Sequence, residues 1–252
     1  MANDWPQGYG YLPLDTVDST LDEAARRFDG LAGPTWITAR RQTKARGRRG
    51  RAWANPEGNF AGTLVLPKVA DPAMAALRSF VTAVALDEAF VALTGRSEAF
   101  ALKWPNDVLL NGGKVAGILL ESVTRQGRLA GLSIGIGVNL AHAPAPASLE
   151  PGAVAPVSLG EATGITVTPE DFLEALAPAF ARREHQFVTY GFAPIREAWL
   201  ARAARIGEVV TARLPAEEIT GTFRTVDEAG QLVLSTAGGD RRIAAGDVFF
   251  QG

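Results

Sequence analysis

The chain has 252 residues, of which 47% are hydrophobic and 21% charged, proportions typical of a globular protein and not of a disordered or fibrous one. Its formal net charge of -2 excludes a global basic field of the kind that holds nucleic acid non-specifically. The sequence contains no cysteine and two widely separated histidines, which excludes disulfides and thiolate nucleophiles and argues against a histidine-rich metal site.

The start of the chain carries no targeting signal that we recognise. Residues 1–11 include Asp4 and lack the basic start and apolar core of a secretory signal. No stretch approaches the roughly 18 consecutive apolar residues needed to cross a bilayer. We therefore expect a cytoplasmic protein that does not attach to a membrane.

Helix and strand signals alternate through the first 140 residues. Thr20 and Glu23 have the spacing of a capping box, and Asp71 followed by Pro72 is a strong helix start. Asn111, Gly112 and Gly113 are typical of a hairpin turn. The expected elements are a helix from residues 18–20 to 30, strands at 35–39 and 59–66, a helix from 71 to 95, and strands at 100–110, 115–123 and 129–140.

The second part of the chain changes from helices to short strands. Residues 141–156 are rich in Ala and Pro and predict a mobile surface loop. A helix should begin at Thr168, with a kink or a break at Pro178, and another should cover residues 194–204. Period-two patterns then predict strands at 208–214, 219–226, 232–235 and 241–244. These four strands indicate a small all-β domain that docks on the larger one.

Four arginines fall within the six residues 46–51, the arginine loop, and Trp53 follows them. A guanidinium group offers a planar fork of donors that matches phosphate oxygens. The mutual repulsion of four cations is most easily explained if an anion neutralises them. A solvated charged loop and an RNA-binding patch are the alternatives, although a single neighbouring aromatic residue gives the latter little support.

A second group of polar residues lies on the expected hairpin, with Lys103 to Asp107 on one arm and Lys114 and Gly117 on the other. Pro105 removes a ladder donor and marks an edge or a bulge that aims its neighbours out of the sheet. Asn106 and Asp107 could then face a nucleotide or its Mg²⁺, which favours oxygen ligands. A decorated hairpin without function is the alternative.

Two further patterns can each be explained either by structure or by function. Gly135 and Gly137 alternate along a strand that ends at Asn139, which suits either a flat ligand or a closely packed helix. The dinucleotide-binding fingerprint is excluded because its third glycine is missing. Ser19 and Thr20 have the character of helix caps, and Gln42 could offer its amide to a polar ring. His142 and His185 are expected to be non-catalytic.

Together these residues resemble the catalytic core of the biotin protein ligases. Residues 46–53 are similar to that family's arginine-rich loop, residues 103–107 to its Lys-Trp-Pro-Asn-Asp strand and residues 114–119 to its Lys-x-Ala-Gly-Ile-Leu segment. Residues 135–139 and the Ser19-Thr20 pair also match, and the terminal domain resembles the family's SH3-like barrel. Two departures are Ala45, where the loop usually has glycine, and Leu21, where asparagine commonly follows Ser-Thr.

The resemblance implies an α+β fold with a mixed central sheet flanked by helices in residues 1–205, and an SH3-like barrel in residues 206–252. It implies that ATP and Mg²⁺ activate biotin to biotinyl-5'-AMP, and that biotin then passes to a lysine of a biotin carboxyl carrier domain of a carboxylase. DNA binding is not expected, because no helix-turn-helix segment precedes Ser19. A homodimer is a further expectation.

The resemblance also assigns roles to individual residues. The catalytic group comprises Lys114, Arg48 and Arg51, whose charges would stabilise the anions of the first step. The biotin site would comprise Ser19, Thr20, Gln42, Arg46, Gly47, Arg48, Lys114, Gly117 and Gly137. The nucleotide site would comprise Arg48, Arg51, Trp53, Asn106, Asp107, Lys114 and Asn139, with Asp107 as the candidate Mg²⁺ ligand.

Three other functions fit parts of the pattern. A lipoate ligase or related acyltransferase shares the fold and the adenylate chemistry but would not be expected to carry the arginine loop. An RNA-binding module would use the same arginines and would bind with a steep dependence on salt. A catalytically silent regulatory domain is the third alternative, and the presence of Lys114, Arg48 and Asp107 argues against it.

Overall fold

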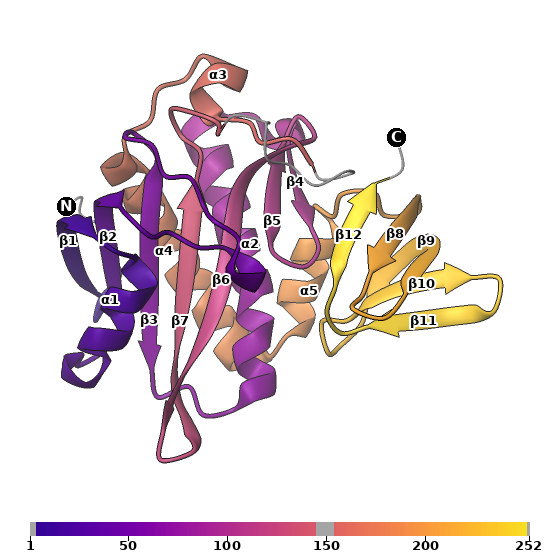
Figure 1. The fold of residues 1–252 in the computed structure, drawn as a ribbon, viewed down its shortest axis with the longest axis horizontal. Helices are drawn as coiled ribbons and strands as arrows, with labels where there is room; N and C mark the ends of the chain where they lie inside the picture. Colours follow the sequence, from indigo (N-terminus) through magenta and orange to yellow (C-terminus); the bar gives the residue numbers. More distant parts are fainter. Residues whose placement is uncertain (1–3, 145–153, 251–252) are drawn as a thin grey trace.

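The computed structural model describes residues 4–144 and 154–250. These residues form a larger α+β unit built on a seven-stranded sheet, and a smaller unit built on a five-stranded sheet (Figure 1). The strands of the larger unit are β1 (Gly10–Val17), β2 (Thr35–Gln42), β3 (Phe60–Pro67), β4 (Phe100–Lys103), β5 (Asp107–Leu110), β6 (Gly113–Arg125) and β7 (Arg128–Val138). Its helices are α1 (Thr20–Arg27), α2 (Pro72–Thr94), α3 (Leu159–Thr163), α4 (Pro169–Tyr190) and α5 (Ala193–Leu200).

The large sheet has the strand order β1-β2-β3-β7-β6-β5-β4. Strands β1 and β2 are parallel, and every other neighbouring pair is antiparallel. Helices α2 and α4 pack together behind the sheet, whereas α1 and the segment between β2 and β3 cross its front face (Figure 1). The front face is therefore the one that receives the arginine loop.

Helix α2 is the central element of the core, and local signals fix both of its ends. The side chain of Asp71 accepts a hydrogen bond from the Ala73 amide at 2.9 Å, and Pro72 occupies the first helical position. At the other end Gly95 adopts the left-handed conformation with φ 68°, which glycine reaches without a steric penalty. Most α2 side chains are buried, as expected for a helix enclosed between a sheet and other helices.

Helix α1 covers the front face over glycines of β7. A Cβ atom on Gly131 would lie 2.5 Å from the Phe28 ring, and one on Gly135 would lie 2.8 Å from Leu21. The sheet can approach the helix this closely only because β7 lacks side chains at these positions. Packed helix residues therefore occupy two of the alternate glycine positions of β7.

The smaller unit contains β8 (Val209–Arg213), β9 (Glu218–Val226), β10 (Leu232–Thr236), β11 (Gly239–Ile243) and β12 (Asp247–Phe250), in the order β11-β10-β9-β8-β12. It lies against the β4–β5 end of the large sheet (Figure 1). The indole of Trp104 donates a hydrogen bond of 3.0 Å to the Gly230 carbonyl. Buried residues of the two units form one continuous apolar cluster, so this C-terminal barrel is firmly docked.

The expected α+β architecture is confirmed, although the sequence patterns did not predict strands β1 and β12 or helix α3. Residues 100–110 form two antiparallel strands and not one, because the chain reverses at residues 104–106 with a cis bond before Pro105. Pro105 therefore lies in a turn, and not at an edge or a bulge within a single strand as predicted.

Two other expectations concern the second half of the chain. Helix α4 runs unbroken from Pro169 to Tyr190 with Pro178 inside it, so of the two predicted alternatives a break into two helices is wrong, and a kink at Pro178 stays a prediction. Part of the predicted mobile loop, residues 145–153, lies outside the described residues. Among the residues that are described, no helix is both long and apolar enough to cross a membrane.

Candidate active site

The arginine loop closes on itself as a tight turn between β2 and β3. The Gly47 amide donates to the Arg51 carbonyl at 2.7 Å, and the Trp53 amide donates to the Ala45 carbonyl at 3.1 Å. Arg49 and Gly50 adopt positive φ angles of 56° and 72°, which lets the chain reverse within three residues. The Gly47 amide, predicted to face biotin, is thus used inside the loop.

Arg46 is held by carboxylates of the larger unit. Its guanidinium donates to Glu121 on β6 at 3.0 and 3.1 Å and to Asp22 on α1 at 2.8 Å. These hydrogen bonds raise the pKa of Arg46 above its ordinary value, Asp22 contributing most. The first arginine of the loop is therefore bound and charge-compensated before any ligand arrives.

The other three arginines converge on Asp247 of the C-terminal barrel. Their guanidinium nitrogens lie 3.4 Å (Arg48), 2.8 Å (Arg49) and 3.2 Å (Arg51) from its carboxylate oxygens. Arg48 also donates to the Gly246 carbonyl at 3.2 Å and to Asn106 Oδ1 at 3.2 Å. Burial lowers the pKa of Arg48, and the neighbouring arginines lower it further. Two nearby carboxylates raise it but do not outweigh these effects.

A group of two lysines and one carboxylate lies beside Arg48, with Lys103 buried and Lys114 partly exposed. Lys114 Nζ is 2.6 Å and Lys103 Nζ is 3.7 Å from the Asp107 carboxylate. Burial raises the pKa of Asp107, but the two ammonium groups and Arg48 outweigh it and hold the pKa below its ordinary value. Burial lowers the pKa of Lys103, against the effect of Asp107. The carboxylate is thus ionised between two cations.

This cluster carries an excess of positive charge. Even with Arg51 left out of the count, four cations (Arg48, Arg49, Lys103 and Lys114) face the two carboxylates Asp107 and Asp247. Like charges this close are costly in a partly buried setting, where screening by water is weak. A bound polyanion would relieve that cost, as the arginine spacing predicts.

Trp53 brings the loop onto the front face of the sheet. A Cβ atom on Gly137 would lie 2.5 Å from its indole, and one on Gly117 would lie 3.3 Å from both the indole and Lys114 Cε. The Lys114 ammonium is 5.5 Å from the centre of the indole ring, within the range of a cation–π interaction. Trp53, Lys114 and the two glycines therefore form a single surface.

Ser19 and Thr20 have different roles, and Thr20 does not form the capping box that its spacing from Glu23 predicted. Ser19 is the helix cap, because its hydroxyl accepts from the Leu21 amide at 3.2 Å. Thr20 does not cap: its amide and hydroxyl donate to Gln42 Oε1 at 2.8 and 3.1 Å, and its hydroxyl accepts from Thr63 at 2.8 Å. A polar cluster of Thr20, Gln42 and Thr63 therefore lies on the front face.

The two predicted nucleotide-facing asparagines are both anchored to backbone. Asn106 Nδ2 donates to the Ile118 carbonyl at 2.6 Å. Asn139, which is 1% exposed, donates to the Val157 carbonyl at 3.1 Å, and its Oδ1 has no hydrogen-bond partner among the described residues. A buried amide oxygen without a partner is costly, and the contact of Asn139 with a nucleotide stays a prediction.

The chain is similar to known proteins over most of its length. Residues 11–139 match the Biotin/lipoate A/B protein ligase family, and residues 206–251 match the Biotin protein ligase C terminal domain. A Paracoccus denitrificans protein named Biotin--[acetyl-CoA-carboxylase] ligase is 53% identical over 239 residues, covering 95% of this chain and all of the relative. This chain belongs to the biotin protein ligase family.

Other family members agree in fold and in extent. The Bacillus subtilis Bifunctional ligase/repressor BirA is 31% identical over 94% of this chain and 73% of its own length. The Aquifex aeolicus biotin protein ligase solved in complex with biotin and ATP has a TM-score of 0.81 at 27% identity, covering 95% of this chain and 97% of that one. The SH3-like barrel predicted for this family agrees with the five-stranded C-terminal unit.

The two departures from the family motif have structural explanations. Ala45, in place of the loop's usual glycine, is not among the described residues with positive φ, so a Cβ atom causes no backbone strain there. Leu21, in place of asparagine, is 4% exposed and packs on Gly135. Position 21 therefore contributes to the apolar contact between α1 and β7.

The described residues offer few side chains that could bind a metal ion. Among residues 4–144 and 154–250, no group of three or more His, Cys, Asp or Glu side chains is arranged to hold one. Asp107, the predicted Mg²⁺ ligand, lies between two ammonium groups, an arrangement that opposes a cation. Its role toward Mg²⁺ stays a prediction, and we treat the ion as part of the nucleotide substrate.

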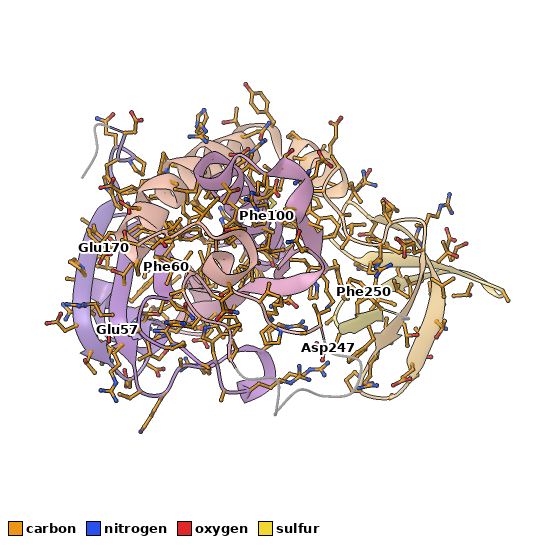
Figure 2. The ribbon with its side chains drawn as sticks, turned by 90° about the horizontal axis from the view of Figure 1, so that it is seen from above. Glu57, Phe60, Phe100, Glu170, Asp247 and Phe250 are labelled. Atoms are coloured by element: carbon orange, nitrogen blue, oxygen red, sulfur yellow. The ribbon has the colours of Figure 1, made fainter. Side chains whose placement is uncertain are left out.

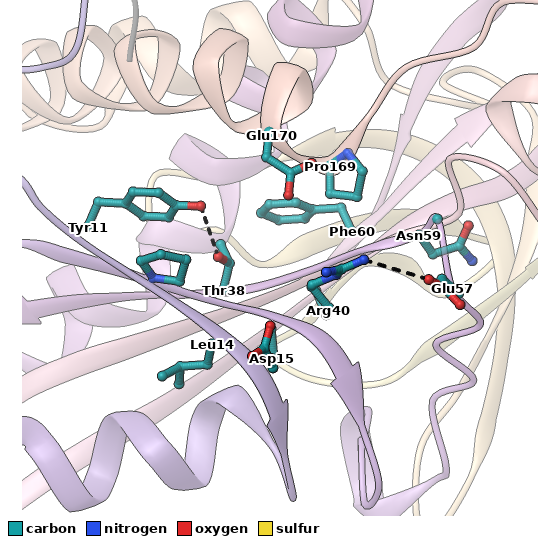
Figure 3. A pocket seen from close by; sticks show the side chains of 14 residues that line it. Tyr11, Leu14, Asp15, Thr38, Arg40, Glu57, Asn59, Phe60, Pro169 and Glu170 are labelled. Carbon is teal, nitrogen blue, oxygen red and sulfur yellow. Dashed lines mark hydrogen bonds and ion pairs between the residues drawn. The ribbon is translucent and has the colours of Figure 1, made fainter.

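A cavity also lies elsewhere in the molecule. It measures about 430 Å³ and is lined by Tyr11, Thr38, Arg40, Glu57, Phe60 and Glu170 among others, behind β1 and β2 at the start of α4 (Figure 3). Glu57 and Glu170 lie on the opposite side of the molecule from Asp247 (Figure 2). The predicted site residues do not line this cavity, because they gather on the front face, where α1 and the arginine loop fill much of the space.

Reasoning from sequence missed the residues that hold the family's arginine loop in place. Asp22, Glu121 and Asp247 bind the arginines, and Thr63 completes the polar cluster with Thr20 and Gln42. No local signal marks these carboxylates, because ordinary helix and strand surfaces carry many of them. Only Thr63, a buried hydroxyl on an otherwise apolar strand, offered a hint in the sequence.

Proposed function

We propose that this chain is a biotin protein ligase that activates biotin with ATP and transfers it to a lysine of a biotin carboxyl carrier domain. One observation carries the proposal: Trp53 of the arginine loop and Lys114 of the hairpin meet on the strand face opened by Gly117 and Gly137, and Arg48 of the same loop lies 3.2 Å from Asn106 on that hairpin. The 53% identity to a ligase named for acetyl-CoA carboxylase supports the same reaction and the same kind of carrier.

In the first step a biotin carboxylate oxygen attacks the α-phosphorus of ATP, the bond to the β-phosphate breaks, and pyrophosphate leaves. Two anions must approach each other, so cations placed where charge develops lower the barrier. Lys114 and Arg48 fill that role, with Arg51 beside them. Magnesium enters with the nucleotide and supplies further charge neutralisation to the phosphates.

The polar cluster of Thr20, Gln42 and Thr63 is suited to the ureido end of biotin. It presents hydroxyl and amide groups at the edge of an otherwise apolar surface, which is the chemistry of a ring that both donates and accepts hydrogen bonds. Ser19 supports this cluster from the helix cap. The ring system would lie between the cluster and Trp53.

The nucleotide would extend from Arg48 toward the far end of β7. Asn106 orients Arg48, and the unpaired Oδ1 of buried Asn139 is available to an amino group of the base. Asp107 holds Lys114 by an ion pair of 2.6 Å. These assignments, like a homodimer and a cytoplasmic location, remain predictions.

In the second step the carrier lysine attacks the acyl carbon of biotinyl-5'-AMP, AMP leaves, and the amine loses a proton to solvent or to a nearby base. No enzyme nucleophile is needed, in agreement with a chain that contains no cysteine. The lysine must attack as the neutral amine. Transfer is therefore expected to accelerate as pH rises toward the pKa of the carrier lysine.

The deciding experiment is mass spectrometry of a purified carrier domain incubated with the protein, biotin and Mg-ATP. We expect a mass gain of one biotinyl group on one lysine. A parallel reaction with lipoate separates the related ligases of the same fold, because lipoylation in place of biotinylation would reassign the substrate. Absence of both products would refute the proposed function.

A further inference from the structure

The arginine loop is anchored in two halves, on two different structural units. Arg46 binds Asp22 and Glu121 on α1 and β6 of the larger unit. Arg48, Arg49 and Arg51 bind Asp247 at the start of β12 in the C-terminal barrel. Arg46, assigned to the biotin site alone, and Arg48 and Arg51, assigned to the nucleotide site, therefore have separate supports.

Asp247 is well placed to gather the three arginines. Its side chain is 15% exposed and lies on the side of the barrel that faces the catalytic unit (Figure 2). One carboxylate oxygen is 3.4 Å from Arg48, and the other is 2.8 Å from Arg49 and 3.2 Å from Arg51. The adjoining Gly246 carbonyl accepts a second bond from Arg48 at 3.2 Å.

The electrostatics favour an ordering role for this carboxylate. Three guanidinium groups drawn to one point repel one another, and without a shared anion the side chains would separate into solvent. One carboxylate occupies only a few of the fifteen or so N–H donors that three arginines provide, at about five each. Arg48 and Arg49 alone place two cations on this one carboxylate, so net positive charge is left for a larger anion even without Arg51.

We propose that Asp247 is a positioning residue that holds Arg48, Arg49 and Arg51 ready for the phosphates of ATP. The inference rests on the proposed function, because it takes the nucleotide as the anion. The affinity for ATP should then depend on the docked barrel through Asp247. The affinity for biotin should depend on Asp22 and Glu121, which bind Arg46 within the larger unit.

The test compares Asp247→Asn, Asp247→Glu and the control Asp240→Asn in biotin-dependent exchange of pyrophosphate into ATP. Asp240 is a matched control because it is a barrel carboxylate that pairs with an arginine, Arg224, remote from the loop. We expect Asp247→Asn to raise the KM for ATP about tenfold, the loss of roughly one charge-assisted hydrogen bond. The KM for biotin should change less than about twofold.

The other two variants should differ from Asp247→Asn in their KM for ATP. Asp247→Glu should recover most of the ATP affinity, since it restores the charge on a longer side chain, and Asp240→Asn should match the wild type. An unchanged KM for ATP in Asp247→Asn would overturn the proposal. A lowered KM would overturn it as well, because Asp247 would then compete with the phosphates instead of preparing their site.

Hydrogen exchange gives a readout that does not depend on the reaction. The amides of Gly47 and Arg51 donate within the loop, and we expect them to exchange faster in Asp247→Asn while the amides of α1 keep their wild-type rates. Equal loop exchange in the two proteins would overturn the positioning role. If the wild type shows no biotin-dependent pyrophosphate exchange, the proposed function fails, and hydrogen exchange alone decides this inference.

Discussion

The indole of Trp53 lies directly on Gly137, at a position where a Cβ atom would come within 2.5 Å of the ring. The contact fixes how closely the arginine loop approaches the sheet. It also makes this glycine sensitive to the smallest substitution, since the loop must move outward to admit even a methyl group.

The first prediction tests this contact. Gly137→Ala should displace Trp53 and the loop with it, raising the KM values for biotin and ATP at least about tenfold while costing roughly 1 to 3 kcal/mol in unfolding free energy. Steady-state pyrophosphate exchange and urea unfolding measure the two effects. Gly30→Ala is the control, since a Cβ atom there meets nothing within 4 Å. Wild-type KM values in Gly137→Ala would show that the loop position is unimportant.

The second prediction concerns the charge at the reacting phosphate. Lys114→Ala should reduce adenylate formation by about 10² to 10³, the usual effect of removing one group that stabilises developing charge. Arg48→Ala should behave similarly. Circular dichroism should remain that of the wild type, and Arg128→Ala, an exposed cation at the β6–β7 turn, should retain full activity. Biotin-dependent pyrophosphate exchange at the wild-type rate in Lys114→Ala contradicts the assignment.

The third prediction follows from the buried pair of Lys103 and Asp107. Asp107→Asn leaves the Lys103 ammonium beside Lys114 without its carboxylate, and should cost about 3 to 5 kcal/mol in unfolding free energy near neutral pH. Burial already lowers the pKa of Lys103, and losing Asp107 lowers it further. The folded variant then binds fewer protons than the unfolded chain, so its stability should rise with pH until about pH 10.4, the ordinary lysine pKa.

Urea unfolding of the wild type and Asp107→Asn at about pH 7 and about pH 9.5 measures this dependence. The stability deficit of the variant should be smaller at the higher pH. The double variant Lys103→Met with Asp107→Asn serves as the control, because the part of the pH dependence that Lys103 causes should be absent from it. An equal deficit of Asp107→Asn at both pH values would rule out Lys103 as its source.

The fourth prediction tests the support of Arg46. Glu121→Gln removes the charge that binds its guanidinium at 3.0 and 3.1 Å, and should raise the KM for biotin about three- to tenfold. The KM for ATP should stay near the wild-type value, the reverse of the effect expected for Asp247→Asn. Glu98→Gln, an exposed carboxylate on a distant turn, is the control. A parallel rise in both KM values would mean that the loop responds as one unit.

Sequence alone predicted the parts of this protein that local chemistry specifies. Asp71, Pro72 and Gly95 mark the ends of α2 because capping and left-handed backbone are properties of single residues. The arginine loop, the Lys103–Asp107 strand and Lys114 were recognisable as motifs, since dense charge beside glycine is unusual. Their resemblance to the motifs of the biotin protein ligases, which occur in the same order, predicted both the fold and the reaction class.

Tertiary structure decided which residues those motifs meet. Asp247 lies nearly 200 positions from Arg48, and no local pattern links a barrel carboxylate to a distant loop. Likewise, residues 100–110 carry strand-forming residues on both sides of Pro105, and the hydrogen bond from Trp104 to the Gly230 carbonyl accompanies their reversal into two strands. Ion pairs and close packing depend on where the chain returns in space, so the supports of the arginine loop could be found only in the folded protein.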